Sequence, residues 1–373
     1  MPPRAILFPS RVQEGLGEGM SPLLDIPSAS PSRAREGSNA PPPDHPVIPP
    51  RKLGVLLINL GTPDGPDTRS VRRYLAEFLS DRRVVELPAI AWQPILRGVI
   101  LRTRPRKSAH AYKQVWRDDG SPLAAITRAQ SVALQGAWGS EVVVDWAMRY
   151  GRPAIAERLH ALKDQGCERI LLAPLYPQYC AATTATANDK AFAALAGMRW
   201  QPAIRTLPPY HDDPAYIDAL KTTIEGGLAA LPFQPDAIVA SFHGMPKRTL
   251  QLGDPYHCHC QKTARLLSEA LGRELVVAFQ SRFGPAKWLG PATDEELVRL
   301  AREGKKRVAI FAPGFSADCL ETLEELSIRG RESFVAAGGT DFAYLPCLND
   351  SAPGVAMLKT ILTRELAGWR NAP

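Results

Sequence analysis

The run GVLLINL, residues 54–60, is apolar at nearly every position. A strand that helices cover on both faces of a parallel sheet is apolar throughout, whereas a half-exposed strand alternates between apolar and polar residues. RILLA at 169–173 and RVAIFA at 307–312 show the same continuous pattern. These runs indicate parallel sheets that are buried on both faces.

Short runs of this kind alternate along the chain with longer segments of helical period. We predict strands at Gly54–Leu60, Glu141–Met148, Arg169–Ala173, Ala237–Phe242, Glu274–Phe279, Arg307–Ala312 and Phe342–Leu345. We predict helices at Ser70–Leu79, Pro153–Gln165, Pro214–Leu231, Thr263–Leu271 and Asp294–Glu303. Because alternating strands and helices build βαβ units, the fold class is α/β, with two Rossmann-like, doubly wound domains and a cleft between them.

The domain boundaries follow from composition and from this alternation. Residues 1–51 form a Pro-rich extension that we expect to be disordered, since twelve of the 35 prolines lie in residues 1–50 without any hydrophobic period. We assign 52–175 to the N-terminal domain and 176–340 to the C-terminal domain. The final strand and helix, in 341–373, are expected to cross back to the first domain.

Composition narrows the class of protein. The 373 residues carry a formal charge of +7, which suits an anionic partner without identifying it. No apolar run approaches the roughly 20 residues of a membrane span, and no signal peptide is evident, so we expect a cytoplasmic protein. The six cysteines are too sparse for a disulfide scaffold. Dinucleotide, P-loop, zinc-protease and serine-hydrolase motifs are all missing from the sequence.

The chemistry is expected where the predicted strands end, because ligands of open α/β sheets bind at that edge. His243 ends the fourth strand within SFHGMP, and Glu321 follows the sixth strand within APGFSADCLETLEEL. Each residue alone has an ordinary structural explanation: a buried histidine bonded to backbone, or a glutamate at a helix start. Together they make an imidazole–carboxylate pair that suits Fe(II) and proton transfer.

Several motifs together resemble those of the ferrochelatases. GVLLINLGTPDGPDT, MRYG, LYPQY, SFHGMP, FQSRFGPAKWLGPATDEEL and APGFSADCLETLEEL occur in that family's order over residues 52–365. The resemblance implies a class II chelatase-like fold that holds a porphyrin between its domains. It also implies an enzyme, a lyase that inserts Fe(2+), its substrate, into protoporphyrin IX to form protohaem in the last step of haem biosynthesis.

The resemblance assigns roles to residues of this chain. His243 and Glu321 are implied as catalytic and metal-site residues, with His243 accepting the pyrrole protons. The implied porphyrin cleft comprises Tyr150, Tyr176, Gln178, Trp288, Phe315 and Asp318.

Two further expectations concern partners and cofactors. The basic and apolar segment 86–112 corresponds to the family's pocket lip, so we expect it to make a peripheral contact with the inner membrane. Some family members carry a [2Fe–2S] cluster, and the C-x-C pair here suggests one as a less favoured alternative. Its ligands would be Cys180, Cys258, Cys260 and Cys347, in preference to Cys167 and Cys319.

Other functions stay open at this stage. Coproporphyrin is an alternative substrate, and a cobalt or nickel chelatase of the same fold is an alternative enzyme. A non-catalytic tetrapyrrole-binding protein would need the aromatic cleft but not the pair His243 and Glu321. A nucleic-acid binder is disfavoured, because the sequence lacks aromatic–basic RNA motifs and carries acidic helices. The oligomeric state is not specified by the sequence.

Overall fold

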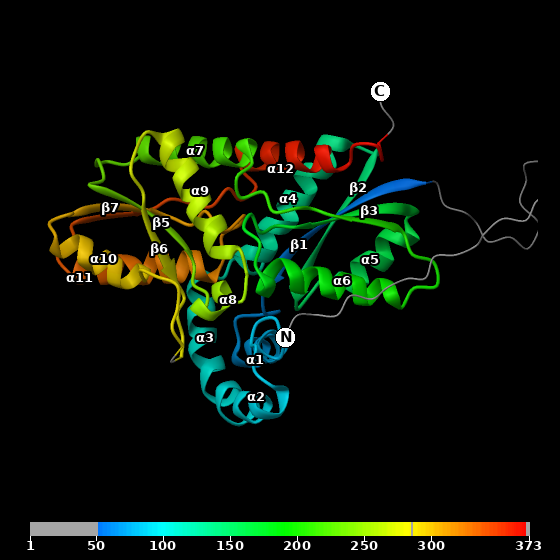
Figure 1. Cartoon of the computed structure of the whole chain (residues 1–373), viewed down its shortest axis with the longest axis horizontal. Coiled ribbons are helices and arrows are strands. Elements are labelled where there is room, and N and C mark those ends of the chain that lie inside the picture. The colour runs from blue at the N-terminus through cyan, green and yellow to red at the C-terminus, as the bar shows by residue number, and fades with distance from the viewer. Residues whose placement is uncertain (1–50, 285, 371–373) are drawn as a thin grey trace, which may run out of the picture. The chain divides into compact units, whose positions relative to one another are not determined.

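The computed structural model describes residues 51–284 and 286–370. Except for Arg51, the predicted extension of residues 1–51 lies outside this range. Two parallel sheets form the framework (Figure 1). The first contains β1 (Lys52–Gly61), β2 (Val142–Tyr150), β3 (Cys167–Pro174) and β4 (Ala203–Thr206) in the order β2-β1-β3-β4. The second contains β5 (Ala237–His243), β6 (Val276–Gln280), β7 (Arg307–Phe311) and β8 (Asp341–Tyr344) in the order β6-β5-β7-β8.

The two sheets have the same strand order, each counted from its own first strand. The chain is therefore duplicated in structure, although no repeat is visible in its sequence. In each sheet the order reverses between the first and third strands, which is where doubly wound folds bind their ligands. For the second sheet this point lies between β5 and β7.

Helices connect the strands in both halves. The first half contains α1 (Thr68–Leu79), α2 (Ala89–Ile95), η1 (Leu96–Ile100), α3 (Leu101–Val115), α4 (Pro122–Trp138), α5 (Ile155–Asp164), η2 (Ala181–Ala185) and α6 (Thr186–Ala196). The second contains α7 (Pro214–Ala229), α8 (Lys247–Gln251), α9 (Tyr256–Leu271), α10 (Thr293–Arg302), η3 (Glu321–Gly330), α11 (Arg331–Ala336) and α12 (Ala352–Glu365). The elements η1, η2 and η3 are π-helical.

The hydrophobic core covers both faces of both sheets. One buried cluster spans the two sheets and includes Leu57 of β1, Phe242 of β5 and Leu362 of α12. Two further clusters cover the opposite faces, with α5 and α6 on the first sheet and α10 and η3 on the second. This explains why the strands are continuously apolar, and it confirms the predicted parallel α/β architecture.

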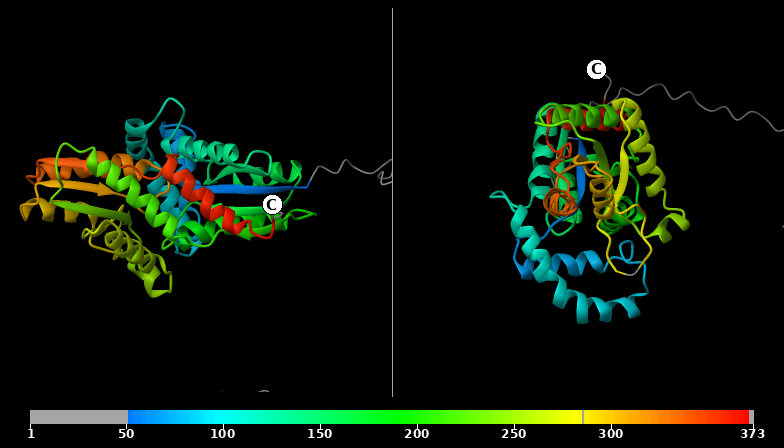
Figure 2. Two further views of the ribbon diagram at one scale, coloured as in Figure 1. Left: turned by 90° about the horizontal axis from the view of Figure 1, so that it is seen from above. Right: turned by 90° about the vertical axis from the view of Figure 1, so that its left-hand side faces the viewer.

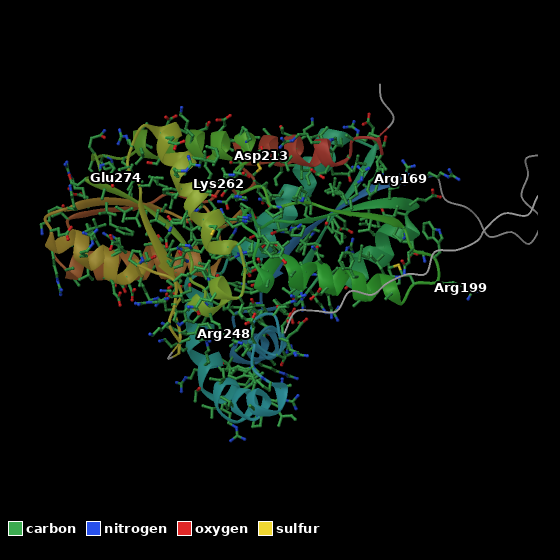
Figure 3. The ribbon with its side chains drawn as sticks, viewed as in Figure 1. Arg169, Arg199, Asp213, Arg248, Lys262 and Glu274 are labelled. Carbon is green, nitrogen blue, oxygen red and sulfur yellow. The ribbon has the colours of Figure 1, made fainter. Side chains whose placement is uncertain are left out.

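Helices α7 and α12 run along one side of both sheets, as Figures 1 and 2 show. Helix α12 packs against α7 and against α4 of the first half. Asp213, labelled in Figure 3, caps α7 by accepting a hydrogen bond from the Ala215 N–H at 2.9 Å, and it also pairs with Arg364 of α12. The last helix therefore joins the two halves.

Two of the predicted domain boundaries are wrong. The first sheet continues to Thr206, because β4 pairs with β3, so the N-terminal domain extends beyond residue 175. The final strand, β8, pairs with β7 and belongs to the second sheet. In the described part of segment 341–373, helix α12 packs against α4 of the first half, and Asn349 also accepts a hydrogen bond from Gln130 of that helix. The missed strand β4 is four residues long and is partly exposed along its length.

Helices α1, α2 and α3 follow β1 and precede β2 in the sequence. They form a separate layer below the sheets in the view of Figure 1. Asp67 caps α1 by accepting hydrogen bonds from the backbone N–H groups of Arg69 and Ser70. A small core that includes Leu96 and Tyr112 holds the layer together. We call α2, η1 and α3, residues 89–115, the lip. Among the described residues, no helix is long and apolar enough to cross a membrane.

Candidate active site

His243 is the last residue of β5, and its side chain is half-buried. Its ring meets that of Phe315 edge-on, with 6.2 Å between centroids and 67° between planes. The next residue, Gly244, turns the chain beside β6, and its N–H donates to the Gln280 carbonyl at 2.7 Å. A Cβ at Gly244 would lie 2.6 Å from that carbonyl oxygen, so only glycine fits without a shift. The sequence SFHG thus places the imidazole at the carboxyl edge of the sheet.

Glu321 begins η3, the π-helix that follows the loop after β7. The two predicted catalytic residues therefore flank the switch point of the second sheet, one after β5 and the other after β7. Gln280 connects them: it lies opposite His243 in the β5–β6 register, and its Nε2 donates to the Glu321 carbonyl at 3.1 Å. A helix start also favours a negative side chain such as that of Glu321.

The lip and α1 face the start of η3. Burial raises the pKa of Tyr112 on α3 well above its ordinary value, and the charge of Glu321 raises it further. The same two causes, together with Tyr112 itself, raise the pKa of Tyr74 on α1. Burial lowers the pKa of Arg104 on α3, and Glu321 opposes that shift. The charge of Glu321 is therefore felt by two phenols and one guanidinium of the first half.

An aromatic group lies beside His243 in the loop that follows β6. Trp288 is close enough that a Cβ at Gly244 would contact its ring at 3.5 Å. It packs against Phe283 with 5.2 Å between ring centroids, and Phe283 is 46% exposed. The Arg104 guanidinium of the lip lies 4.9 Å from the centre of the Phe283 ring. Trp288, Phe315 and Phe283 therefore offer flat apolar surfaces around the histidine.

Two of the predicted cleft residues lie behind this surface instead of in it. Tyr150 is fully buried, and its hydroxyl donates to Asp81 at 2.8 Å while the Arg149 guanidinium stacks on its ring. Gln178 is 2% exposed and donates to the Thr263 hydroxyl of α9 at 3.1 Å. Their prediction as wall residues is corrected, because α1 covers the first and α9 covers the second.

Two more of the six predicted cleft residues, Asp318 and Tyr176, have no described contact with His243. Asp318 is 5% exposed, and both of its carboxylate oxygens accept hydrogen bonds from neighbouring side chains. Tyr176 is half-buried at the end of β3, and no described residue bonds its hydroxyl. Trp288 and Phe315 are therefore the predicted cleft residues that the structure brings to His243.

The four cysteines suggested for a [2Fe–2S] cluster do not converge. Cys180 and Cys260 are buried in the cluster that spans both sheets, whereas Cys347 belongs to the core of η3 and α10. Cys258 is exposed on α9. Within residues 51–284 and 286–370, no three His, Cys, Asp or Glu side chains are grouped to hold a metal ion. The cysteine positions do not fit the cluster, and that prediction is corrected.

Two surface hollows lie away from these residues. One, of about 590 Å³, is lined by charged residues of α10 and by Ser333 of α11. The other, of about 340 Å³, is lined mainly by α4. Neither lining includes a histidine, and Arg299 in the first hollow is already paired with Glu296 and Glu303. The strand edge is therefore the better candidate site.

Sequence reasoning assigned no catalytic or cleft role to Gln280, Tyr74, Tyr112, Arg104 or Phe283, although it placed Tyr112 and Arg104 in the basic and apolar segment 86–112. The position of Gln280 at a strand end within FQSRFGP was the available signal. The two tyrosines and Arg104 carry no local signal, because only the packing of the lip brings them to Glu321.

Comparisons with known proteins identify the family of the chain. A family model described as ferrochelatase matches residues 52–366. The ferrochelatase of Rhizobium meliloti (strain 1021) is 59% identical over 333 residues, which cover 87% of this chain and 98% of the relative. The ferrochelatase of Agrobacterium fabrum (strain C58) is 54% identical over 338 residues, covering 89% and 98%.

Solved structures share the fold at low sequence identity. SirB from Bacillus subtilis with Fe3+ aligns with a TM-score of 0.53 and 14% identity, covering 85% of this chain and 97% of SirB. The sirohydrochlorin chelatase SirB from Bacillus subtilis subspecies spizizenii, in complex with cobalt, gives 0.50 and 12%, covering 86% and 98%. The likeness concerns the fold alone, and it confirms the predicted class II chelatase-like architecture.

Proposed function

The chain belongs to the ferrochelatase family, and we propose that it inserts ferrous iron into protoporphyrin IX to form protohaem. It is a lyase of haem biosynthesis. The observation that carries the proposal is the placement of His243 and Glu321 on either side of one switch point, linked by Gln280. A carrier that only bound tetrapyrroles would need the aromatic surfaces but not this pair.

The chemistry of the substrate explains why such a pair is useful. A free-base porphyrin carries two central N–H protons, and iron enters only after they leave. A neutral imidazole accepts protons at physiological pH, and His243 reaches the edge of the sheet where a macrocycle would lie against Phe315 and Trp288. Stacking on these rings supplies binding energy that helps to hold the macrocycle in a bent shape. We assign Glu321 to the iron approach or to the path by which the protons leave.

Anaerobic incubation with Fe(II) and protoporphyrin, followed through the Soret band, tests the proposal. We expect the wild-type protein to insert iron and His243→Ala to lose nearly all activity while still binding porphyrin. Glu321→Gln should also lose most activity, because the amide neither carries charge nor accepts a proton at neutral pH. Porphyrin binding without insertion by the wild-type protein would instead favour the carrier.

Protoporphyrin is preferred over coproporphyrin on the form of the SFHGMP motif. The two substrates differ in the number of carboxylates at the periphery, so the same assay with each porphyrin distinguishes them. We expect the higher kcat/KM with protoporphyrin. A higher value with coproporphyrin would reassign the substrate but not the reaction.

We further propose that the protein works in the cytoplasm and contacts the inner membrane through the lip and the residues just before it. Leu87, Ile90, Ile95 and Val99 are each 46–92% exposed. Exposed basic residues flank them, namely Arg97, Arg102, Arg106 and Lys107. A surface of this kind binds anionic lipid, at about 1 kcal/mol for each basic residue near the headgroups.

Sedimentation with vesicles tests this contact. The protein should pellet with vesicles that contain phosphatidylglycerol and remain in solution with pure phosphatidylcholine. Ile90→Ser combined with Val99→Ser should reduce pelleting without changing activity on detergent-dispersed porphyrin. Unchanged pelleting of that double variant would rule out the lip as the contact.

A further inference from the structure

The amide oxygen and the amide nitrogen of Gln280 each form a hydrogen bond with an element that carries a residue of the candidate site. It is the last residue of β6 and is 3% exposed. Its Oε1 accepts from the Ser241 hydroxyl of β5 at 2.8 Å, and its Nε2 donates to the Glu321 carbonyl of η3 at 3.1 Å. Its own carbonyl accepts from the Gly244 N–H. One buried residue therefore bonds to the strand of His243, to the turn that follows it, and to the helix of Glu321.

The next residue fastens the same strand end to the same helix. Ser281 has a φ of 67°, a left-handed conformation that is unusual for serine and persists only where its surroundings hold it. Its N–H donates to Glu325 Oε1 at 2.8 Å and its hydroxyl donates to Glu325 Oε2 at 2.5 Å. Glu325 lies four residues after Glu321, on the next turn of η3. Both of its oxygens are therefore engaged by the residue that begins the Trp288 loop.

We infer that Gln280 and Glu325 are positioning residues, which hold the end of β6 against η3 and thereby fix His243 and Glu321 relative to each other. The inference rests on the proposed roles of that pair. Glu325 holds the end of β6 because its two carboxylate oxygens accept hydrogen bonds from Ser281. Neither residue needs to touch the porphyrin or the iron.

The side chain of Gln280 is the more direct of the two links between the pair. The Glu321 carbonyl belongs to the residue that carries the catalytic carboxylate, so its bond to Gln280 fixes the first residue of the helix. His243 lies directly opposite Gln280 in the sheet. Catalytic groups must be held within about 0.5 Å of their productive positions. A displacement of about 1 Å lowers the reaction rate by about a hundredfold.

Gln280→Leu removes both side-chain bonds at nearly constant volume. Gln135→Leu is the matched control, because Gln135 also bonds through its amide to several backbone groups, but at the amino end of β2. We expect Gln280→Leu to lower kcat about ten- to a hundredfold, with the porphyrin Kd, measured by fluorescence, within about threefold of wild type. Gln135→Leu should lower only the Tm. A Gln280→Leu variant that keeps more than half of the wild-type kcat would overturn the inference.

Gln280→Glu provides a second test, which applies even if the Gln280→Leu variant folds poorly. Its carboxylate still accepts from Ser241, but it repels the Glu321 carbonyl until it is protonated, when it becomes a donor. Its kcat relative to wild type should therefore recover as the pH is lowered. A ratio that does not change with pH would contradict a positioning bond.

Glu325 is tested by two substitutions. In Glu325→Gln the amide oxygen still accepts from the Ser281 N–H, and the amide nitrogen donates to the Ser281 hydroxyl oxygen. We expect this variant to keep most of its kcat/KM and Glu325→Ala to lose at least about tenfold. Equal loss in both would show that the charge matters, and would overturn the positioning role. Absence of insertion by the wild-type protein would overturn the proposed function and this inference together, whereas an active wild type with unaffected variants overturns only the inference.

Discussion

Asp318 is the most heavily bonded carboxylate next to the site. Its Oδ1 accepts from the Thr322 hydroxyl at 2.9 Å and from the Tyr344 hydroxyl, and its Oδ2 accepts from the Asn349 amide at 2.6 Å. Asn349 in turn accepts from the Asp318 N–H at 2.8 Å, and its carbonyl accepts from Gln130 of α4 at 2.8 Å. The carboxylate thus holds together the turn before Glu321, β8 and a contact with the first half.

Replacing Asp318 by alanine should destabilise the protein strongly. The change removes three hydrogen bonds to a charged acceptor, and it leaves the Tyr344 hydroxyl and the Asn349 amide without that partner. A buried polar group left without a partner costs about 1–3 kcal/mol, so the expected loss is about 3–5 kcal/mol of unfolding free energy. For a chain of this size that corresponds to a Tm lower by about 10 °C.

Thermal and urea unfolding measure this loss, and a reciprocal exchange provides the control. Asp318→Asn keeps only one acceptor oxygen, so its new amide nitrogen meets either the Asn349 amide or the hydroxyls of Thr322 and Tyr344. Combining it with Asn349→Asp exchanges donor and acceptor and should recover much of the stability. The reasoning is refuted if Asp318→Ala costs less than about 1 kcal/mol, or if the double variant is no more stable than Asp318→Asn.

Three further predictions concern other parts of the chain. Burial, and then the stacked ring of His259, lower the pKa of His211 to about 4. Since an unfolded histidine titrates near ~6.5, this contribution to stability is complete above that pH and is lost as the pH falls toward 4. The rise of Tm with pH over that range should flatten in His211→Phe, which keeps a ring on His259. Cys258 is the exposed cysteine among six, so a thiol reagent should modify one thiol rapidly in the native protein and all six after unfolding. Asp81→Ala removes the acceptor shared by Arg149, Tyr150 and Thr186, and it should cost about 3 kcal/mol in urea unfolding.

The sequence predicts the strands well where they are buried on both faces. GVLLINL and RVAIFA need no tertiary information, because continuous burial leaves a continuous apolar run. The strand Ala203–Thr206 was not predicted, since an edge strand of four partly exposed residues has no distinctive pattern of apolar residues. Helix α4 is also missing from the predicted helices, because it lacks a clear polar face. It packs against β1, β2 and α12, so apolar residues occur around most of its circumference.

The site is predictable only in part, because a motif identifies a residue but not its surroundings. His243 lies where the sequence places it, since a strand end and a following glycine are local features. Tyr150 stands in an equally recognisable motif, yet α1 and the lip bury it completely. The cysteine pair on α9 is local as well, but Cys260 and Cys347 belong to different hydrophobic clusters of the second half, which only the tertiary structure reveals.

The two halves contribute to the site in different ways. The second half holds both His243 and Glu321, and buried neutral groups of Gln280 and Ser241 join them without adding charge near the reacting centre. The first half contributes the lip, whose helix α3 packs against η3, and the pKa values of its Tyr112 and Arg104 respond to the charge of Glu321. A movement of the lip that admits a porphyrin would therefore change the environment of Glu321. It would leave the bonds of Gln280 to Ser241 and Glu321 in place, because all three residues belong to the second half.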